Sequence, residues 1–112
     1  MPLERDKIIR YDVDRMAFEF TMIDMAQGKA KIVNCKISST AMDQLAGIKG
    51  TMPSEREAQF VSLRDSVERI ASDLFDKAVP KLVQIHIFHH HVPLTHKQLR
   101  NHWRKRKPAR DR

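Results

Sequence analysis

The stretch from Ser54 to Ala78 constrains the fold more than any other part of this sequence, because it has the spacing of one long amphipathic helix. Ser54 and Glu57 fit the S-x-x-E capping box, in which each side chain accepts a hydrogen bond from the other residue's backbone. Pro80 is expected to end the helix. Apolar side chains recur at steps of three and four along one stripe: Phe60, Leu63, Val67, Ile70 and Leu74. We expect this stripe to pack into a core, or alternatively to pair with a second copy of the helix.

Two stretches before this helix alternate between apolar and polar side chains, which is typical of strands with one buried face. They cover residues 16–25 and 29–37, and Gly28 between them suits a tight turn. The pattern therefore predicts an antiparallel hairpin. The side chains expected in its core are Phe18, Phe20 and Met22 from the first strand, and Val33, Cys35 and Ile37 from the second.

A short helix and a third strand complete the predicted domain. Ser38, Ser39 and Thr40 offer N-caps for a short helix that Gly47 ends. Residues 81–88 alternate again and predict a strand. Its two faces would carry Val83, Ile85 and Ile87 on one side, and Gln84, His86 and Phe88 on the other.

The sequence therefore predicts an α+β fold with a small antiparallel sheet, made of the β-hairpin and the third strand. A short and a long amphipathic helix lie on one face, the order is β-β-α-α-β, and a basic C-terminal helix follows. Because 112 residues leave room for one core, residues 1–94 form the α+β domain and residues 95–112 the basic helix and tail. The sequence does not choose which edge of the hairpin the third strand joins.

The positive charge of the chain is confined to its C-terminal end. The chain carries a net charge of +7, and residues 97–112 contain eight Lys or Arg and one Asp, so the preceding residues are neutral. A T-x-x-Q box predicts a helix from Thr95 to about Lys107. On that helix Leu99 and Trp103 share a face, from which they dock on the body or stack on a base.

We expect this basic segment to bind phosphates, because Lys and Arg gain affinity by releasing the counterions condensed on a polyanion. The sequence carries no base-reading motif, so binding to nucleic acid would tolerate many sequences. The alternatives are a solvated tail that only aids solubility, and a segment that binds an acidic protein or an anionic membrane surface. The candidate nucleic-acid or anion-binding residues are Lys97, Arg100, Trp103, Arg104, Lys105, Arg106 and Lys107.

All six histidines lie between residues 86 and 102. In an extended chain His89 and His91 would share one face about 6.5 Å apart, which is within reach of one metal ion. However, no Asp or Glu lies between Lys77 and Arg110 to orient such ligands. We therefore expect an exposed strand end with titrating histidines, without metal or cofactor, and keep His89 and His91 as the metal candidates.

No arrangement of nucleophile, base and orienting group can be named in this sequence. The single cysteine, Cys35, alternates with core residues and is expected to be a buried thiol. We therefore expect a protein that is not an enzyme. One cysteine, a charged N-terminus and no apolar run of roughly 20 residues favour the cytoplasm over a membrane or secretion.

Three short motifs resemble a small bacterial family known only as domain of unknown function 1488. They are Arg15–Phe20 (RMAFEF), Cys35–Ser38 (CKIS) and Ala41–Leu45 (AMDQL), and the resemblance covers roughly residues 8–80. It implies a small α+β bacterial protein of the cytoplasm. It supplies no activity, ligand or catalytic residue, and the histidines and the basic tail lie outside it.

These observations predict a small non-enzymatic binding module that contacts nucleic acid or another polyanion through its basic C-terminal tail. The alternative is a protein-interaction or structural module that dimerises through the long helix, with the tail incidental. A third hypothesis is a His-rich metal-binding protein.

Overall fold

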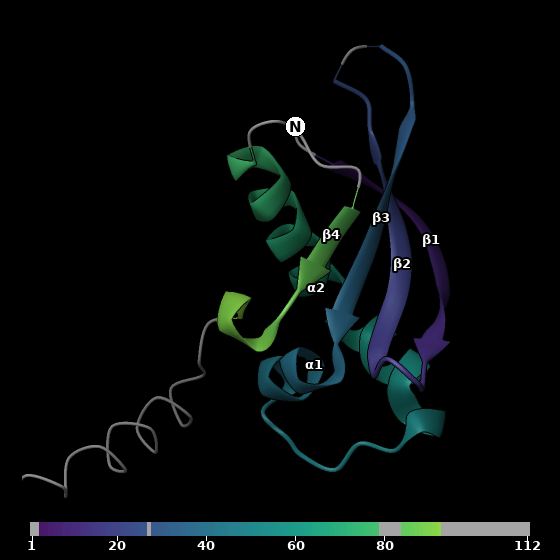
Figure 1. Ribbon diagram of the computed structural model, residues 1–112, viewed down its shortest axis with the longest axis vertical. Coiled ribbons are helices and arrows are strands. Elements are labelled where there is room, and N and C mark those ends of the chain that lie inside the picture. The colour runs from purple at the N-terminus through teal and green to yellow at the C-terminus, as the bar shows by residue number, and fades with distance from the viewer. Residues whose placement is uncertain (1–2, 27, 79–83, 93–112) are drawn as a thin grey trace, which may run out of the picture.

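A computed structural model describes residues 3–26, 28–78 and 84–92 of the chain. It is an α+β fold, as predicted, built on one four-stranded sheet with the strand order β1-β2-β3-β4 (Figure 1). The strands are β1 (Leu3–Asp12), β2 (Ala17–Asp24), β3 (Lys31–Ser38) and β4 (Gln84–Ile87). The helices are α1 (Ser39–Ala46) and α2 (Arg56–Lys77), with 3₁₀ turns η1 (Pro53–Glu55) and η2 (His89–His91). The described residues form no helix that is long and apolar enough to cross a membrane.

Strand β1 is an element that the sequence analysis missed, so the observed order is β-β-β-α-α-β. It pairs antiparallel with β2, and its register shifts twice, between Arg5 and Ile8 and between Ile8 and Arg10. These irregularities break the alternation from which a strand is recognised. Its charged residues also suit an edge strand, because charges discourage pairing with another chain.

Strand β4 joins the hairpin at β3 and runs parallel to it, with Cys35 opposite Ile85 and Ile37 opposite Ile87. The sheet is therefore mixed, whereas the sequence analysis expected an antiparallel one. The physical reason is the connection, because α1 and α2 together form a crossover that brings the chain back to its starting end of the sheet. As predicted, Ile85 and Ile87 face the core and His86 and Phe88 do not.

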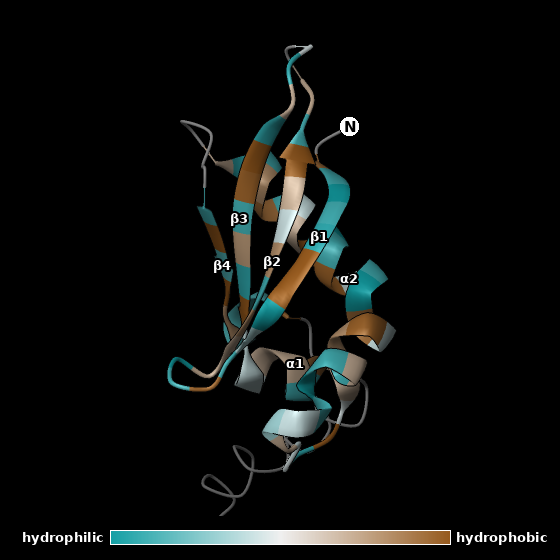
Figure 2. Cartoon of the chain, turned by 90° about the vertical axis from the view of Figure 1, so that its right-hand side faces the viewer, coloured by the Kyte–Doolittle hydropathy of each residue, from teal (hydrophilic) through white to brown (hydrophobic). Residues whose placement is uncertain are grey.

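The core lies between the sheet and the helices, and Figure 2 shows α2 behind the four strands. Phe60 of α2 stacks on Phe18 with ring centroids 4.5 Å apart and contacts Phe20 at 5.0 Å. Both predicted strand faces are buried, which confirms the alternation. Of the predicted α2 stripe, Phe60 and Val67 are fully buried, while three side chains are partly exposed: Leu63, Ile70 and Leu74.

Helix α2 begins at Arg56, one residue later than the capping pattern predicted, but the 3₁₀ turn η1 before it extends the helical segment back to Pro53. The capping hydrogen bond runs from the backbone N–H of Met52 to Glu55 Oε1, at 3.0 Å, so the predicted box at Ser54 and Glu57 was wrong. Pro53 lies in the first turn, where its missing N–H costs nothing, and this shifts the start of the helical segment towards Met52.

A polar cluster fixes α1 to the start of α2. Asp43 Oδ1 accepts hydrogen bonds from Arg56 Nη1 at 2.7 Å, Gln59 Nε2 at 2.9 Å and Thr51 Oγ1 at 2.7 Å. The Arg56 guanidinium also lies 5.6 Å from the ring centroid of Tyr11, a cation–π distance. Because the Arg56 side chain is only 6% exposed, its charge depends on these partners.

Candidate functional site

The predicted anion-binding residues lie outside the part of the chain that the structure describes, which ends at Val92. Their arrangement therefore stays a prediction. The structure does describe the surface from which this basic segment departs, formed by β4 and η2, and this surface is the candidate site. The residues that remain predictions are Lys97, Arg100, Trp103, Arg104, Lys105, Arg106 and Lys107.

An exposed group of aromatic and imidazole rings covers the end of β4, and we call it the ring cluster: His86, Phe88, His89, His90 and His91. The Phe88 ring lies 4.0 Å from the His86 ring, between centroids, and stacks nearly parallel to the His90 ring at 5.7 Å. The ring centroids of His90 and His91 lie 4.1 Å apart. Phe88 is 41% exposed, so part of its ring remains in contact with solvent.

The turn that holds these rings is fixed from two sides. The side-chain amide of Gln44 on α1 donates hydrogen bonds to the backbone carbonyls of His89, at 3.1 Å, and Val92, at 2.8 Å. The backbone N–H of Phe88 donates to His91 Nδ1 at 2.9 Å. Nδ1 must therefore be unprotonated, so His91 is neutral with its proton on Nε2.

Two of these histidines are held neutral by their surroundings. Burial lowers the pKa of His91 below its ordinary value, and the neighbouring His90 and His86 lower it further. Burial likewise lowers the pKa of His86, and so does Lys36, its neighbour on β3. Near neutral pH the rings of His86 and His91 are therefore uncharged.

Acidification should loosen this turn. Because the pKa of His91 is lowered on folding, the unfolded chain binds the proton first as the pH falls through about 6.5, and stability is lost from that point downwards.

The variant His91→Asn tests this expectation, because asparagine keeps an acceptor for the Phe88 N–H but cannot titrate. We expect the variant to lose less stability than the natural chain between pH 7 and pH 5, measured by urea unfolding. Val61→Asn, at an exposed position on α2 that does not titrate, is the control and should keep the natural pH dependence. If the stability of His91→Asn had the same pH dependence as that of the natural chain, His91 would not be the group whose protonation loosens the turn.

The expected geometry for metal binding was wrong. His89 and His91 lie in the 3₁₀ turn η2 and not on one face of an extended strand. Within the described ranges, no three His, Cys, Asp or Glu side chains gather where they could hold a metal ion.

Cys35 lies in the core, as the alternation predicted. Burial raises the pKa of its thiol to about 12, with a smaller contribution from Glu68. A thiol that stays protonated at neutral pH is a poor nucleophile. The structure therefore describes Cys35 as a core residue.

Ion pairs neutralise many cations of the body. Arg5 pairs with Asp65 at 2.6 Å and with Glu68 at 2.8 Å. On the other face of the sheet, Glu19 lies between Arg10 at 3.6 Å and Lys36 at 3.9 Å. This pairing agrees with the neutral charge of residues 1–96 and leaves the excess positive charge to the segment after the ring cluster.

The sequence analysis did not predict that the Phe88 ring packs against the rings of His86 and His90. A signal was present, because the alternation of residues 81–88 placed a large aromatic side chain on the polar face of a strand.

Comparison with known proteins gives a family and a fold. The family model described as "Protein of unknown function (DUF1488)" matches residues 5–87. A crystal structure of a protein of unknown function from the same family, from Shewanella loihica PV-4, is similar with a TM-score of 0.57 and 20% identity. The similarity covers 74% of this chain and 90% of that one. A comparison with curated proteins found no match. Most of the ring cluster and the whole basic segment lie beyond the family match.

Proposed function

Since this chain belongs to the DUF1488 family of proteins of unknown function, we propose its function from its own surface: it is a non-enzymatic module that binds single-stranded nucleic acid through its basic C-terminal segment. The ring cluster at the end of β4 stacks on the bases. The observation that carries this proposal is the placement of the whole excess charge, +7, directly after an exposed group of flat rings.

The charge supports a polyanion as the ligand. Residues 97–112 carry eight Lys or Arg against one Asp, while the body is neutral and many of its arginines are paired with carboxylates. Each phosphate that a cation neutralises releases condensed counterions, which is the main source of sequence-independent affinity. A flexible single strand can follow such a segment and present its bases to the rings.

The ring cluster supports nucleic acid over other polyanions. Phe88 and His90 are nearly parallel, with 8° between their planes, and both are exposed. Base stacking on aromatic side chains contributes about 1–3 kcal/mol per base and tolerates every base.

Fluorescence of Trp103, the single tryptophan of the chain, tests the proposal. Adding a mixed-sequence single-stranded oligonucleotide in low salt should change the emission, and high salt should restore it. No change in low salt would contradict the proposal.

The stacking role is tested by Phe88→Ala, which should weaken binding by about tenfold because one stacking surface is lost. Ile32→Ala is the matched control, since Ile32 is an exposed apolar residue of the same sheet outside the ring cluster. Equal affinities for Phe88→Ala and the natural chain would remove the rings from the binding surface.

A further inference from the structure

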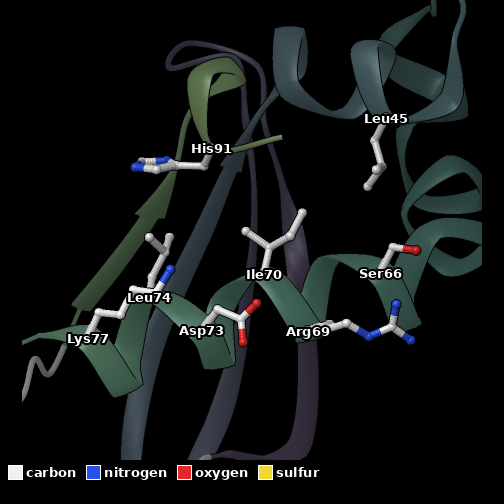
Figure 3. A pocket seen from close by; sticks show the side chains of 8 residues that line it. All are labelled: Leu45, Ser66, Arg69, Ile70, Asp73, Leu74, Lys77 and His91. Carbon is white, nitrogen blue, oxygen red and sulfur yellow. The ribbon is translucent and has the colours of Figure 1, made fainter. Parts of the chain in front are cut away.

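A groove with an apolar floor lies between α1, α2 and η2, apart from the exposed face of the ring cluster. Its volume is about 440 Å³. Figure 3 shows Ile70 and Leu74 pointing from α2 into the same space as Leu45 of α1, with His91 at the rim. These three apolar side chains pack against the core yet remain partly exposed. Covering them would remove apolar surface from water, which is favourable.

The groove explains why the predicted stripe of α2 is only partly buried. Phe60 and Val67 face the sheet and are fully buried, whereas Ile70 and Leu74 line the groove. The apolar stripe of α2 is therefore wider than the part of the helix that contacts the sheet. No other described residue covers Ile70 and Leu74 fully, so they remain partly exposed. A helix with one apolar side is the kind of segment that fills such a groove.

We propose that the groove is filled by this chain's own C-terminal segment, with Leu99 and Trp103 as the side chains that cover Ile70 and Leu74. The described chain ends at Val92, and the two Gln44 hydrogen bonds hold that end against α1. His91, which lines the groove, is only two residues before the start of the remaining segment. The described chain therefore ends beside the groove.

The sequence pattern of the segment fits this role. Leu99 and Trp103 are spaced i, i+4, so they share one face of the predicted helix, beside the cationic stripe. Because the segment is tethered at the groove, its effective concentration there is roughly millimolar, and weak apolar contacts are enough to populate the docked state. In this docking the cationic stripe lies beside the apolar contact, towards the rim of the groove.

The charged residues at the rim of the groove give docking a different salt dependence from nucleic-acid binding. Arg69 and Lys77 line the groove and repel the cationic segment, while Asp73 is the anion among the lining residues. Salt screens this repulsion and does not weaken apolar contact. Docking should therefore persist in high salt, whereas binding to a polyanion should weaken. The inference does not rest on the proposed function.

The test measures how well acrylamide quenches Trp103 in the full chain without nucleic acid, in low and high salt. We expect Trp103 to be shielded, and Leu74→Gln to raise the quenching several-fold. Val61→Gln, an exposed apolar position on the same helix outside the groove, is the matched control and should leave the shielding unchanged. Leu99→Gln lies outside the described domain and should expose Trp103 without unfolding the body, so it gives the answer even where Leu74→Gln unfolds.

Three results would overturn this inference. Trp103 in the natural chain would be quenched as readily as in Leu99→Gln, or it would stay shielded in a folded Leu74→Gln variant, or its shielding would depend on protein concentration. The last result would assign the groove to a second copy of the chain. Nucleic acid is absent from this experiment, so a negative result would reject the docking and not the proposed nucleic-acid binding. Equally, a chain that does not bind nucleic acid could still dock its C-terminal segment in the groove.

Discussion

Replacing Asp43 with alanine should lower the free energy of unfolding by about 3–5 kcal/mol, the cost of leaving a buried charge without its partner. The Asp43 carboxylate accepts from three side chains, and the Arg56 side chain beside it is 6% exposed. Without Asp43, Arg56 keeps two partners among the residues that the structure describes: Gln59, whose Oε1 accepts from Nη1 at 2.7 Å, and the ring of Tyr11. Urea unfolding followed by circular dichroism measures the loss.

The matched control for this prediction is Asp65→Ala. Asp65 also pairs with an arginine, at 2.6 Å from Arg5 Nη2, but its side chain is 86% exposed. An ion pair in water contributes little, so we expect a loss of less than about 1 kcal/mol. The double variant Asp43→Ala with Arg56→Met should recover part of the stability, because no unpaired charge remains buried. Similar losses for Asp43→Ala and Asp65→Ala would contradict the role of the polar cluster.

The pH dependence of Asp43 follows from the same contacts. Partial burial raises the pKa of this carboxyl, but the hydrogen bonds from Arg56, Gln59 and Thr51 outweigh burial and lower the pKa below its usual value. The stabilisation is therefore complete above the ordinary pKa of about 4 and is lost as the pH falls through the lowered value. The stability difference between the natural chain and Asp43→Ala should accordingly shrink in acid.

Neutralising the cationic stripe of the C-terminal segment should weaken nucleic-acid binding by roughly 10³-fold in low salt, because about four phosphate contacts disappear together. The variant replaces four residues with glutamine: Lys97, Arg100, Arg104 and Lys107. The matched control removes the same number of charges from exposed positions of the body, by replacing Lys7, Arg15, Lys29 and Lys49. We expect the control to bind nearly as the natural chain does, measured by fluorescence anisotropy of a labelled oligonucleotide. Equal losses in both variants would mean that net charge, and not this segment, governs binding.

The sequence predicted the elements whose periodicity is clean. Phe18, Phe20 and Met22 alternate without interruption and are all buried, and Phe60 and Val67 on α2 lie in the core as their spacing required. Strand β1 was missed because its register shifts near Ile8 interrupt the alternation. The parallel pairing of β4 could not be predicted, since it depends on how α1 and α2 direct the chain back to β3.

The sequence predicted which residues belong to the candidate site, but it did not predict how the turn arranges them. The charge count located the excess at residues 97–112, and alternation placed Phe88 on the outer face of its strand. The turn at His89–His91 could not be anticipated, because it is fixed by Gln44, a residue 45 positions earlier in the sequence. Long-range contacts of this kind leave no local pattern.

The salt dependence of nucleic-acid binding by the full chain tests the central claim most directly. If the C-terminal cations neutralise about four to six phosphates of a single strand, the logarithm of the binding constant should fall with the logarithm of the salt concentration with a slope of about −3 to −4. The glutamine variant of the cationic stripe loses about four of these contacts, so its slope should be shallower than the natural one by about 3. A natural chain whose affinity does not change with salt, or a variant with the natural slope, would contradict the account.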